Sequence, residues 1–225
     1  MDVSAFRGAV REWLDSHDLT PPAQAGESID AELAQLSRVR AALYGAGWMR
    51  YGWPESVGGL GGPALLRAVL GEEVAARDLA QPGYYSMIEV LAPTMISYAA
   101  PALAAEMVPL LLSGREHWCQ GFSEPGSGSD LASLSTKAVQ QGDNWIITGQ
   151  KVWTSLAQIA RRCVLLTRTA PGHCASDKHS ASDKHSASDK HSASDKHSGV
   201  TAFFTDMDTP GITVRPLRTM HGVDE

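Results

Sequence analysis

The run Gln120-Gly-Phe-Ser-Glu-Pro-Gly-Ser-Gly-Ser-Asp130 is a turn of small residues and hydroxyls, with a glycine on each side of Ser127. Glycine lets backbone N–H groups come close to a ligand, and successive N–H groups in such a turn form a concavity that suits an anion. Ser123 and Ser129 add hydroxyls that can donate to phosphate oxygens or to ring nitrogens. The plainer interpretation is an ordinary turn, which most Gly/Ser-rich stretches are.

A second stretch, Gly149-Gln-Lys-Val-Trp-Thr-Ser155, places the flat face of Trp153 beside the hydroxyls of Thr154 and Ser155. A planar ring that carries a pyrophosphate would suit both stretches, because one offers an aromatic face and the other offers anion-binding amides. The alternative for Trp153 is a core position inside a β-barrel. The residue types alone leave both interpretations open.

Together the two stretches resemble the flavin-binding segments of the acyl-CoA dehydrogenase family. The run Trp118-Cys-Gln-Gly-Phe-Ser-Glu-Pro-Gly-Ser-Gly-Ser-Asp-Leu-Ala132 is similar to the first signature of that family nearly residue for residue. Thr148-Gly-Gln-Lys-Val-Trp-Thr-Ser155 is similar to the second signature, at the separation that the family shows. The resemblance extends from Phe6 to Glu225 and is interrupted by a repeated insert at 175–198.

FAD is the cofactor that this resemblance implies. The residues that would bind it are Gln120, Phe122, Ser123, Gly128, Ser129, Trp153, Thr154 and Ser155. Ser123 would hydrogen-bond the flavin ring, Trp153 would cover one face of that ring, and Ser155 would lie near its N5 atom. Ser129 would also bind substrate, because it would lie where the cofactor and the CoA chain meet.

The activity that the resemblance implies is FAD-dependent α,β-dehydrogenation of an acyl-CoA thioester. A base removes the proton next to the carbonyl, and flavin N5 accepts a hydride from the next carbon. In the family the base is a glutamate, placed in most branches on a C-terminal four-helix domain, and no carboxylate up to Glu225 matches it. Glu124 and Asp130 are expected to shape their turn by accepting backbone N–H bonds instead. We therefore assign no catalytic residue.

The expected protein is an acyl-CoA dehydrogenase component, truncated and completed by a C-terminal helical partner chain. Alone, such a chain should bind FAD weakly or not at all. Its other partners would be an acyl-CoA substrate, an electron-transfer acceptor protein and further acyl-CoA dehydrogenase chains in a homo- or hetero-oligomer. The alternative is a non-catalytic remnant or a partner-binding subunit of an acyl-CoA dehydrogenase complex. The acyl-CoA oxidase branch shares the fold but fits the two motifs less well.

Composition restricts the class of protein and the cellular environment in which it is expected. A formal net charge of −6 and the lack of a basic run argue against a nucleic-acid surface. Cys119, Cys163 and Cys174 fit neither a metal-ligand spacing nor a disulfide framework, which favours a reducing, intracellular environment. The first residues show no secretory signal, and the apolar runs are too short to span a bilayer. The sequence therefore predicts a soluble cytoplasmic protein without a metal site.

Helical periodicity dominates the first 114 residues. Apolar residues at helical spacing predict helices over residues 6–15, 33–43 and 65–75. The long apolar region 84–112 predicts two or three buried helices, broken at Pro93 and Pro101, because proline lacks a backbone donor and clashes with the preceding turn. A glycine-rich loop at 48–63 is expected between the second and third helices.

Short β-rich runs replace this pattern after Arg115. They are Leu134–Ala138, Trp145–Thr148, Cys163–Thr167, Val200–Phe204 and Ile212–Arg215. Gln141-Gly-Asp-Asn144 between two of them predicts a hairpin turn. The expected fold class is α+β, with an all-α helical domain at 1–114 followed by a small antiparallel β-barrel or sandwich domain at 115–225.

The insert at 175–198 is the sequence Ala-Ser-Asp-Lys-His-Ser repeated four times. Each unit lacks a large apolar side chain, so burial cannot offset the conformational entropy lost on ordering. Histidines at six-residue spacing line no helical face, so we expect a disordered loop rather than a metal site.

Deleting residues 175–198 should leave the β domain folded, because the entropy of closing a loop changes only slowly with its length. We expect the unfolding temperature of the deletion variant to stay within about 3 °C of the full chain, measured by circular dichroism. A larger fall would assign the repeat a structural role.

Overall fold

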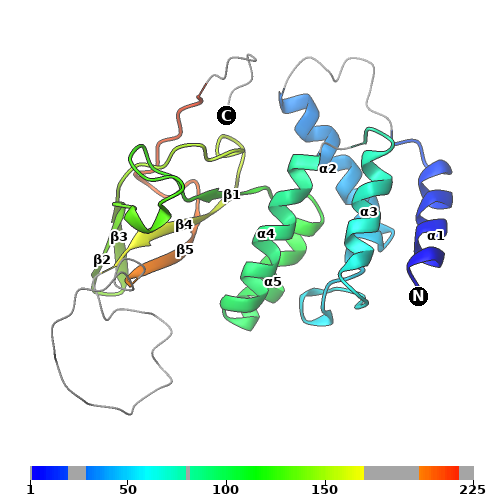
Figure 1. The fold of residues 1–225 in the computed structure, drawn as a ribbon, viewed down its shortest axis with the longest axis horizontal. Coiled ribbons are helices and arrows are strands. Elements are labelled where there is room, and N and C mark those ends of the chain that lie inside the picture. Colours follow the sequence, from blue (N-terminus) through cyan, green and yellow to red (C-terminus); the bar gives the residue numbers. More distant parts are fainter. Residues whose placement is uncertain (1, 20–28, 80–81, 170–197, 218–225) are drawn as a thin grey trace, which may run out of the picture. The chain divides into compact units, whose positions relative to one another are not determined.

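The computed structural model of the chain describes residues 2–19, 29–79, 82–169 and 198–217. The chain divides into two compact units: the helical unit, Met1–His117, and the β unit, Trp118–Glu225. Figure 1 shows helices in the first and a sheet in the second, so the α+β fold class is confirmed. The disorder predicted for the insert concerns residues that, apart from Ser198, lie outside the described ranges.

Helix α1 spans Val3–Asp15 and begins after Asp2, whose carboxylate accepts two backbone hydrogen bonds at 2.9 and 3.0 Å. This N-cap satisfies donors that have no partner within the helix. Phe6, Val10 and Leu14 are buried, four residues apart on one face. The predicted amphipathic helix is confirmed.

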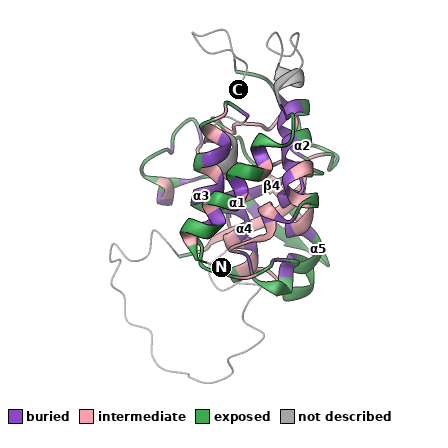
Figure 2. Ribbon diagram, turned by 90° about the vertical axis from the view of Figure 1, so that its right-hand side faces the viewer, coloured by how far each residue is buried: buried purple, intermediate pink, exposed green. Residues whose placement is uncertain are grey.

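The next two helices are α2, Ile29–Gly45, and α3, Leu65–Ala75. Between them the chain forms two short 3-10 turns, η2 (Trp48–Arg50) and η3 (Glu55–Val57). Gly47 has a φ of 90°, a left-handed conformation that glycine adopts without strain, and it follows the end of α2. Figure 2 shows both buried and exposed residues around the helices of this unit, as expected for amphipathic helices that share a core.

Helix α4 spans Pro82–Tyr98 and helix α5 spans Pro101–Leu112. The predicted break at Pro101 is confirmed, since proline suits the first position of a helix, where its missing N–H has no partner anyway. The predicted break at Pro93 is wrong, because α4 continues through it. Leu91, Ala92 and Met95 around it are buried, and this packing outweighs the roughly 3 kcal/mol that an interior proline costs. In the described part of the chain, no helix has the length and apolar character needed to cross a membrane.

In the described part of the β unit, the sheet contains five strands. They are β1 (Trp118–Gly121), β2 (Lys137–Gln141), β3 (Asn144–Thr148), β4 (Arg162–Arg168) and β5 (Val200–Asp206). A short 3-10 turn, η4, spans Leu131–Ser133. The predicted hairpin turn is confirmed, since β2 and β3 pair antiparallel up to Gln141 opposite Asn144.

Strand β4 lies at the centre of this sheet. Along one edge it pairs antiparallel with β5 over its full length, from Arg162 opposite Asp206 to Arg168 opposite Val200. Its other edge is shared by β1, which runs parallel to its first half, and by β2, which joins it at Arg168. The backbone N–H of Thr169 donates to the carbonyl of Gly199 at 2.8 Å, so the β4–β5 pairing is closed just beyond the strands.

Three sequence expectations for the β unit need correction. The sheet is mixed rather than wholly antiparallel, because β1 and β2 both pair parallel with β4. Residues 134–136 precede β2 instead of belonging to it, and residues 212–215 form no strand. Strand β1 was not predicted, since its four residues are part of the first signature and carry no alternating pattern. Parallel pairing joins strands distant in sequence, so no local turn signal reveals it.

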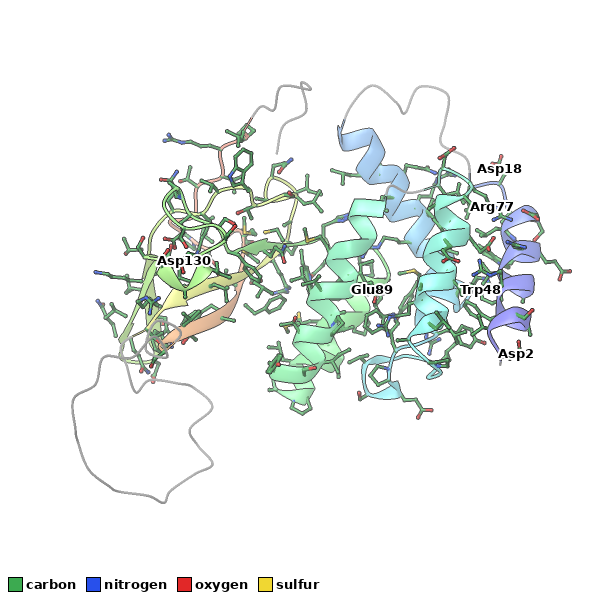
Figure 3. The ribbon with its side chains drawn as sticks, in the orientation of Figure 1. Asp2, Asp18, Trp48, Arg77, Glu89 and Asp130 are labelled. Atoms are coloured by element: carbon green, nitrogen blue, oxygen red, sulfur yellow. The ribbon has the colours of Figure 1, made fainter. Side chains whose placement is uncertain are left out.

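The buried carboxylate of Glu73 on α3 ties that helix to α1. Its side chain is 4% exposed and forms ion pairs with Arg7 and Arg11 of α1, at 2.6 and 2.8 Å, and with Arg77 of its own helix at 3.2 Å. Figure 3 labels Arg77, which also pairs with Asp15 of α1 at 2.7 Å. The hydrogen bond from Arg11 contributes most to lowering the pKa of Glu73 from 4.5 to about 2, against the opposing effect of burial.

Replacing this carboxylate in a Glu73→Gln variant should destabilise the helical unit, because three arginines lose their shared partner. We expect the unfolding temperature at pH 7 to fall by roughly 5–10 °C. The matched control is Glu72→Gln, whose carboxylate is 64% exposed and pairs with Arg7 at the surface; this change should cost no more than about 2 °C.

The pH dependence of this difference checks its cause. A carboxyl whose pKa is lowered in the folded state contributes stability above its unfolded pKa of about 4.5, and this stability is lost as the pH falls towards 2. The gap between the wild type and Glu73→Gln should therefore narrow between pH 4.5 and 2. A gap that stays constant over this range would contradict an electrostatic origin.

Candidate functional site

The structure brings together the two stretches that the sequence singles out. The backbone N–H of Val152 donates to the carbonyl of Ser123 at 2.9 Å. The Nζ atom of Lys151 donates to the carbonyl of Phe122 at 3.0 Å. Segments 120–130 and 149–155, called here the first and second segments, are therefore direct neighbours within the β unit.

The first segment folds back on itself as a tight turn. Glu124 and Ser127 exchange two backbone hydrogen bonds, at 2.7 and 3.1 Å. The hydroxyl of Ser127 is committed to the turn, since it donates to the carbonyl of Asp130 at 2.9 Å (Asp130 is labelled in Figure 3). Gly128 and Ser129, by contrast, are exposed, and Gln120, Phe122 and Ser123 are half-buried. The turn thus leaves its glycines and the Ser129 hydroxyl open to a ligand.

The glycines of this turn are not required by the chain itself. A Cβ added at Gly126 or Gly128 would meet nothing within 4 Å, and neither residue has a positive φ. Gly149 in the second segment differs, because an added Cβ would lie 2.3 Å from Oγ1 of Thr136. Gly149 therefore serves packing, whereas Gly126 and Gly128 leave open space where a ligand can approach the backbone.

Trp153 is the most unusual residue of the second segment. Its side chain is 64% exposed, which excludes the core position considered above. Its backbone is left-handed, with φ at 56°, and Leu156 nearby has φ at 70°. Such conformations cost free energy for residues other than glycine and occur at binding sites more often than elsewhere. An exposed tryptophan held in this way offers a flat face to a planar ring.

Thr154 and Ser155 follow Trp153 directly. The Oγ1 atom of Thr154 is buried and has no hydrogen-bond partner among the described residues, while Ser155 is half-buried. A buried hydroxyl without a partner costs roughly 1–3 kcal/mol. A ligand that accepts from this hydroxyl would remove that cost, so the atom fits a polar ligand beside Trp153.

Glu124 is buried and accepts four hydrogen bonds. Its Oε2 atom accepts from the backbone N–H and the hydroxyl of Ser135, at 2.6 and 2.8 Å. Its Oε1 atom accepts from the N–H of Thr136 at 2.8 Å and from Nζ of Lys151 at 2.9 Å. Burial alone would raise the pKa of Glu124, but the hydrogen bonds from Thr136, Ser135 and Lys151 outweigh it and hold the pKa well below its usual range. The carboxylate stays ionised and, as expected, accepts backbone N–H bonds, here from Ser135 and Thr136.

Sequence reasoning missed Lys151, although it lies inside the second signature. Its side chain is 10% exposed, and its ammonium contacts both Glu124 and the carbonyl of Phe122. A lysine between glycine and tryptophan looks like an ordinary surface residue in the sequence. The only available signal was that it stands two residues before Trp153.

These residues together fit a flavin dinucleotide. Trp153 offers an exposed aromatic face, Thr154 offers a buried unpaired hydroxyl, and the turn at Gly126 and Gly128 offers backbone open to an anion. Among the described residues no cluster of His, Cys, Asp or Glu could hold a metal ion.

Comparison with known proteins supports this interpretation of the two units. The family model described as "Acyl-CoA dehydrogenase, N-terminal domain" matches residues 2–115, and the one described as "Acyl-CoA dehydrogenase, middle domain" matches residues 119–225. The curated relative "Acyl-CoA dehydrogenase IpdE1" of Mycobacterium tuberculosis is 34% identical over 100% of this chain. The chain spans 54% of the length of that relative.

Solved structures give the same assignment. The crystal structure of the ChsE4–ChsE5 complex from Mycobacterium tuberculosis matches 98% of this chain and 50% of its own chain, with a TM-score of 0.73 and 28% identity. A glutaryl-CoA dehydrogenase from Mycobacterium smegmatis, solved in complex with FADH2, matches 96% of this chain and 48% of its own, with a TM-score of 0.65. At 19% identity, this second likeness shows the fold alone.

Substitution by alanine is expected to lower the free energy of unfolding at Gly149 but not at Gly126. Gly149→Ala should lower the free energy of unfolding by about 1–3 kcal/mol, because its methyl group would overlap Thr136. Gly126→Ala is the matched control and should change it by no more than about 0.5 kcal/mol, since the methyl group meets no neighbour. Urea unfolding followed by tryptophan fluorescence measures both. Equal losses in the two variants would contradict this distinction.

Proposed function

We propose, since the chain belongs to the acyl-CoA dehydrogenase family, that the first and second segments hold FAD and that the protein dehydrogenates an acyl-CoA thioester. The family consists of flavoprotein oxidoreductases of lipid metabolism, and the N-terminal and middle family models together cover nearly all of this chain. One structural observation supports the proposal in addition to family membership. Trp153 is exposed in a strained conformation directly before Thr154, whose hydroxyl is buried without a partner.

Each part of the site has a proposed task. The indole of Trp153 stacks on one face of the flavin ring, and the hydroxyls of Ser123, Thr154 and Ser155 hydrogen-bond its polar edge. Gln120 and Phe122 line the same segment, and the backbone at Gly128, together with the hydroxyl of Ser129, binds the pyrophosphate. Ser129 is exposed, so it is also the proposed contact for the CoA chain. Bound flavin supplies the hydride acceptor that acyl-CoA dehydrogenation requires.

The catalytic base is proposed to come from outside residues 1–225. Glu124 stands next to Ser123, but its oxygens accept four hydrogen bonds and its pKa is lowered, so it cannot take up a proton near neutral pH. A helical segment that follows this sequence, or one on a partner chain, would bring the base and close the site against water.

The proposed partners of the chain follow from its family and from the assembly of a related solved structure. ChsE4–ChsE5 is a complex of two different proteins, and 28% identity with one of its chains supports an assembly of this chain with other acyl-CoA dehydrogenase chains. An electron-transfer protein would reoxidise the flavin, and the cytoplasm is the proposed location. The same likeness favours one second candidate function, a subunit that binds its partner and performs no turnover.

FAD titration of the full chain, followed by flavin fluorescence and by the visible absorption spectrum, tests the proposal. Alone, the chain should bind FAD weakly and should not oxidise acyl-CoA with a dye as electron acceptor. Adding a separately expressed chain that carries the C-terminal helical domain of the family should increase FAD affinity and restore turnover. Turnover by the chain alone would show that the base has been misplaced, and tight FAD binding without turnover in the completed assembly would favour the second candidate.

Two variants localise the binding in this assay. Trp153→Leu should weaken FAD binding by about tenfold, since ring stacking contributes about 0.5–1.5 kcal/mol beyond the buried area. The control is Tyr98→Leu, which also removes a highly exposed aromatic ring, 87% exposed, but in the helical unit. It should leave FAD affinity unchanged. Equal FAD affinity in Trp153→Leu and the wild type would remove Trp153 from the site.

A further inference from the structure

The first and second segments have few contacts that fix their spacing. Beyond Gly121, no strand pairing joins the two segments. A single backbone hydrogen bond, from the N–H of Val152 to the carbonyl of Ser123, connects them. Coil segments with so few backbone bonds open easily by local fluctuation. Some other interaction has to keep the Ser123 hydroxyl and the Trp153 ring at a constant separation.

The ion pair between Glu124 and Lys151 supplies that interaction. Glu124 lies next to Ser123, and Lys151 lies two residues before Trp153. Their charged atoms are 2.9 Å apart, with side chains only 4% and 10% exposed. Lys151 also donates to the carbonyl of Phe122, so its ammonium contacts the first segment twice.

The other donors to Glu124 anchor this pair to the sheet. Ser135 and Thr136 immediately precede β2, and the Gly149 backbone packs against the side chain of Thr136. One carboxylate thus joins three parts of the chain: the first segment, the entry to β2 and the second segment. A charge-assisted hydrogen bond in a buried site is stronger and more strictly oriented than a neutral one.

We propose that Glu124 and Lys151 are a positioning pair, which holds the first and second segments at the spacing that FAD binding requires. The pair acts through the segments and needs no contact with the cofactor. The role of the pair in FAD binding rests on the function proposed above. Its effect on the spacing of the two segments can be measured without FAD. Removing one member leaves the other as a buried charge without its partner, so the segments should separate.

Amide hydrogen exchange of the full chain without FAD is the first measurement. Glu124→Gln and Lys151→Met should each speed exchange across residues 149–155 by at least tenfold, while amides of the β4–β5 ladder change by less than threefold. Lys151→Arg keeps the charge and should retain most of the protection. If Glu124→Gln yields no folded protein, Lys151→Met and Lys151→Arg carry the test.

Phe203→Leu is the control for a merely structural effect. Phe203 lies on β5, outside both segments, and packs edge-on against Trp145 at 5.2 Å between ring centroids. This variant should destabilise the β unit, with faster exchange in the β4–β5 ladder and none of the local increase at 149–155. If the positioning-pair variants show the same pattern as Phe203→Leu, the pair only stabilises the fold and the proposal is overturned.

FAD affinity, measured in the assembly completed with the C-terminal helical domain, is the second measurement. Glu124→Gln and Lys151→Met should weaken binding at least tenfold, and Lys151→Arg by less than threefold. Wild-type affinity in both neutralised variants would overturn the positioning role. If the wild type binds no FAD while exchange at 149–155 still rises locally in the variants, the proposed function fails and the structural role of the pair stands.

Discussion

A buried carboxylate must be surrounded by hydrogen-bond donors. In the β unit, Glu124 carries such a carboxylate. Its two oxygens accept from Ser135, Thr136 and Lys151, so four hydrogen bonds from two separate stretches converge on one side chain. An unpaired charge at this position would cost several kcal/mol, so the stretches around it are obliged to meet. The turn after β1, the approach to β2 and the segment that carries Trp153 all take their places from this convergence.

Much of the fold follows from local patterns that a single sequence displays. The Phe6–Val10–Leu14 stripe, the start of a helix at Pro101 and the hairpin turn before Asn144 each follow from a spacing or from the chemistry of a single residue. Pro93 shows the limit of such rules, because burial of its neighbours outweighs its local preference. Strand β1 and its parallel pairing with β4 could not be predicted, since the two strands meet only through tertiary structure.

The candidate site, like the fold, could be predicted from the sequence only in part. Its residues could be located in the sequence because two signatures resemble those of a known family. Whether Trp153 lies in the core or at the surface, and whether the hydroxyl of Thr154 has a partner, depends on contacts that no spacing encodes. Lys151 was missed for the same reason, since a lysine becomes informative only when its ammonium is seen to be enclosed.

The hydrogen bond between Thr169 and Gly199 has an evolutionary consequence. It closes the β4–β5 pairing before the six-residue repeat of the sequence intervenes, so the ladder register does not depend on how many copies lie between them. Doubling the length of such a connection costs only about 0.6 kcal/mol of closure entropy. Replication slippage within the tandem repeat can therefore add or remove copies with little selection from folding.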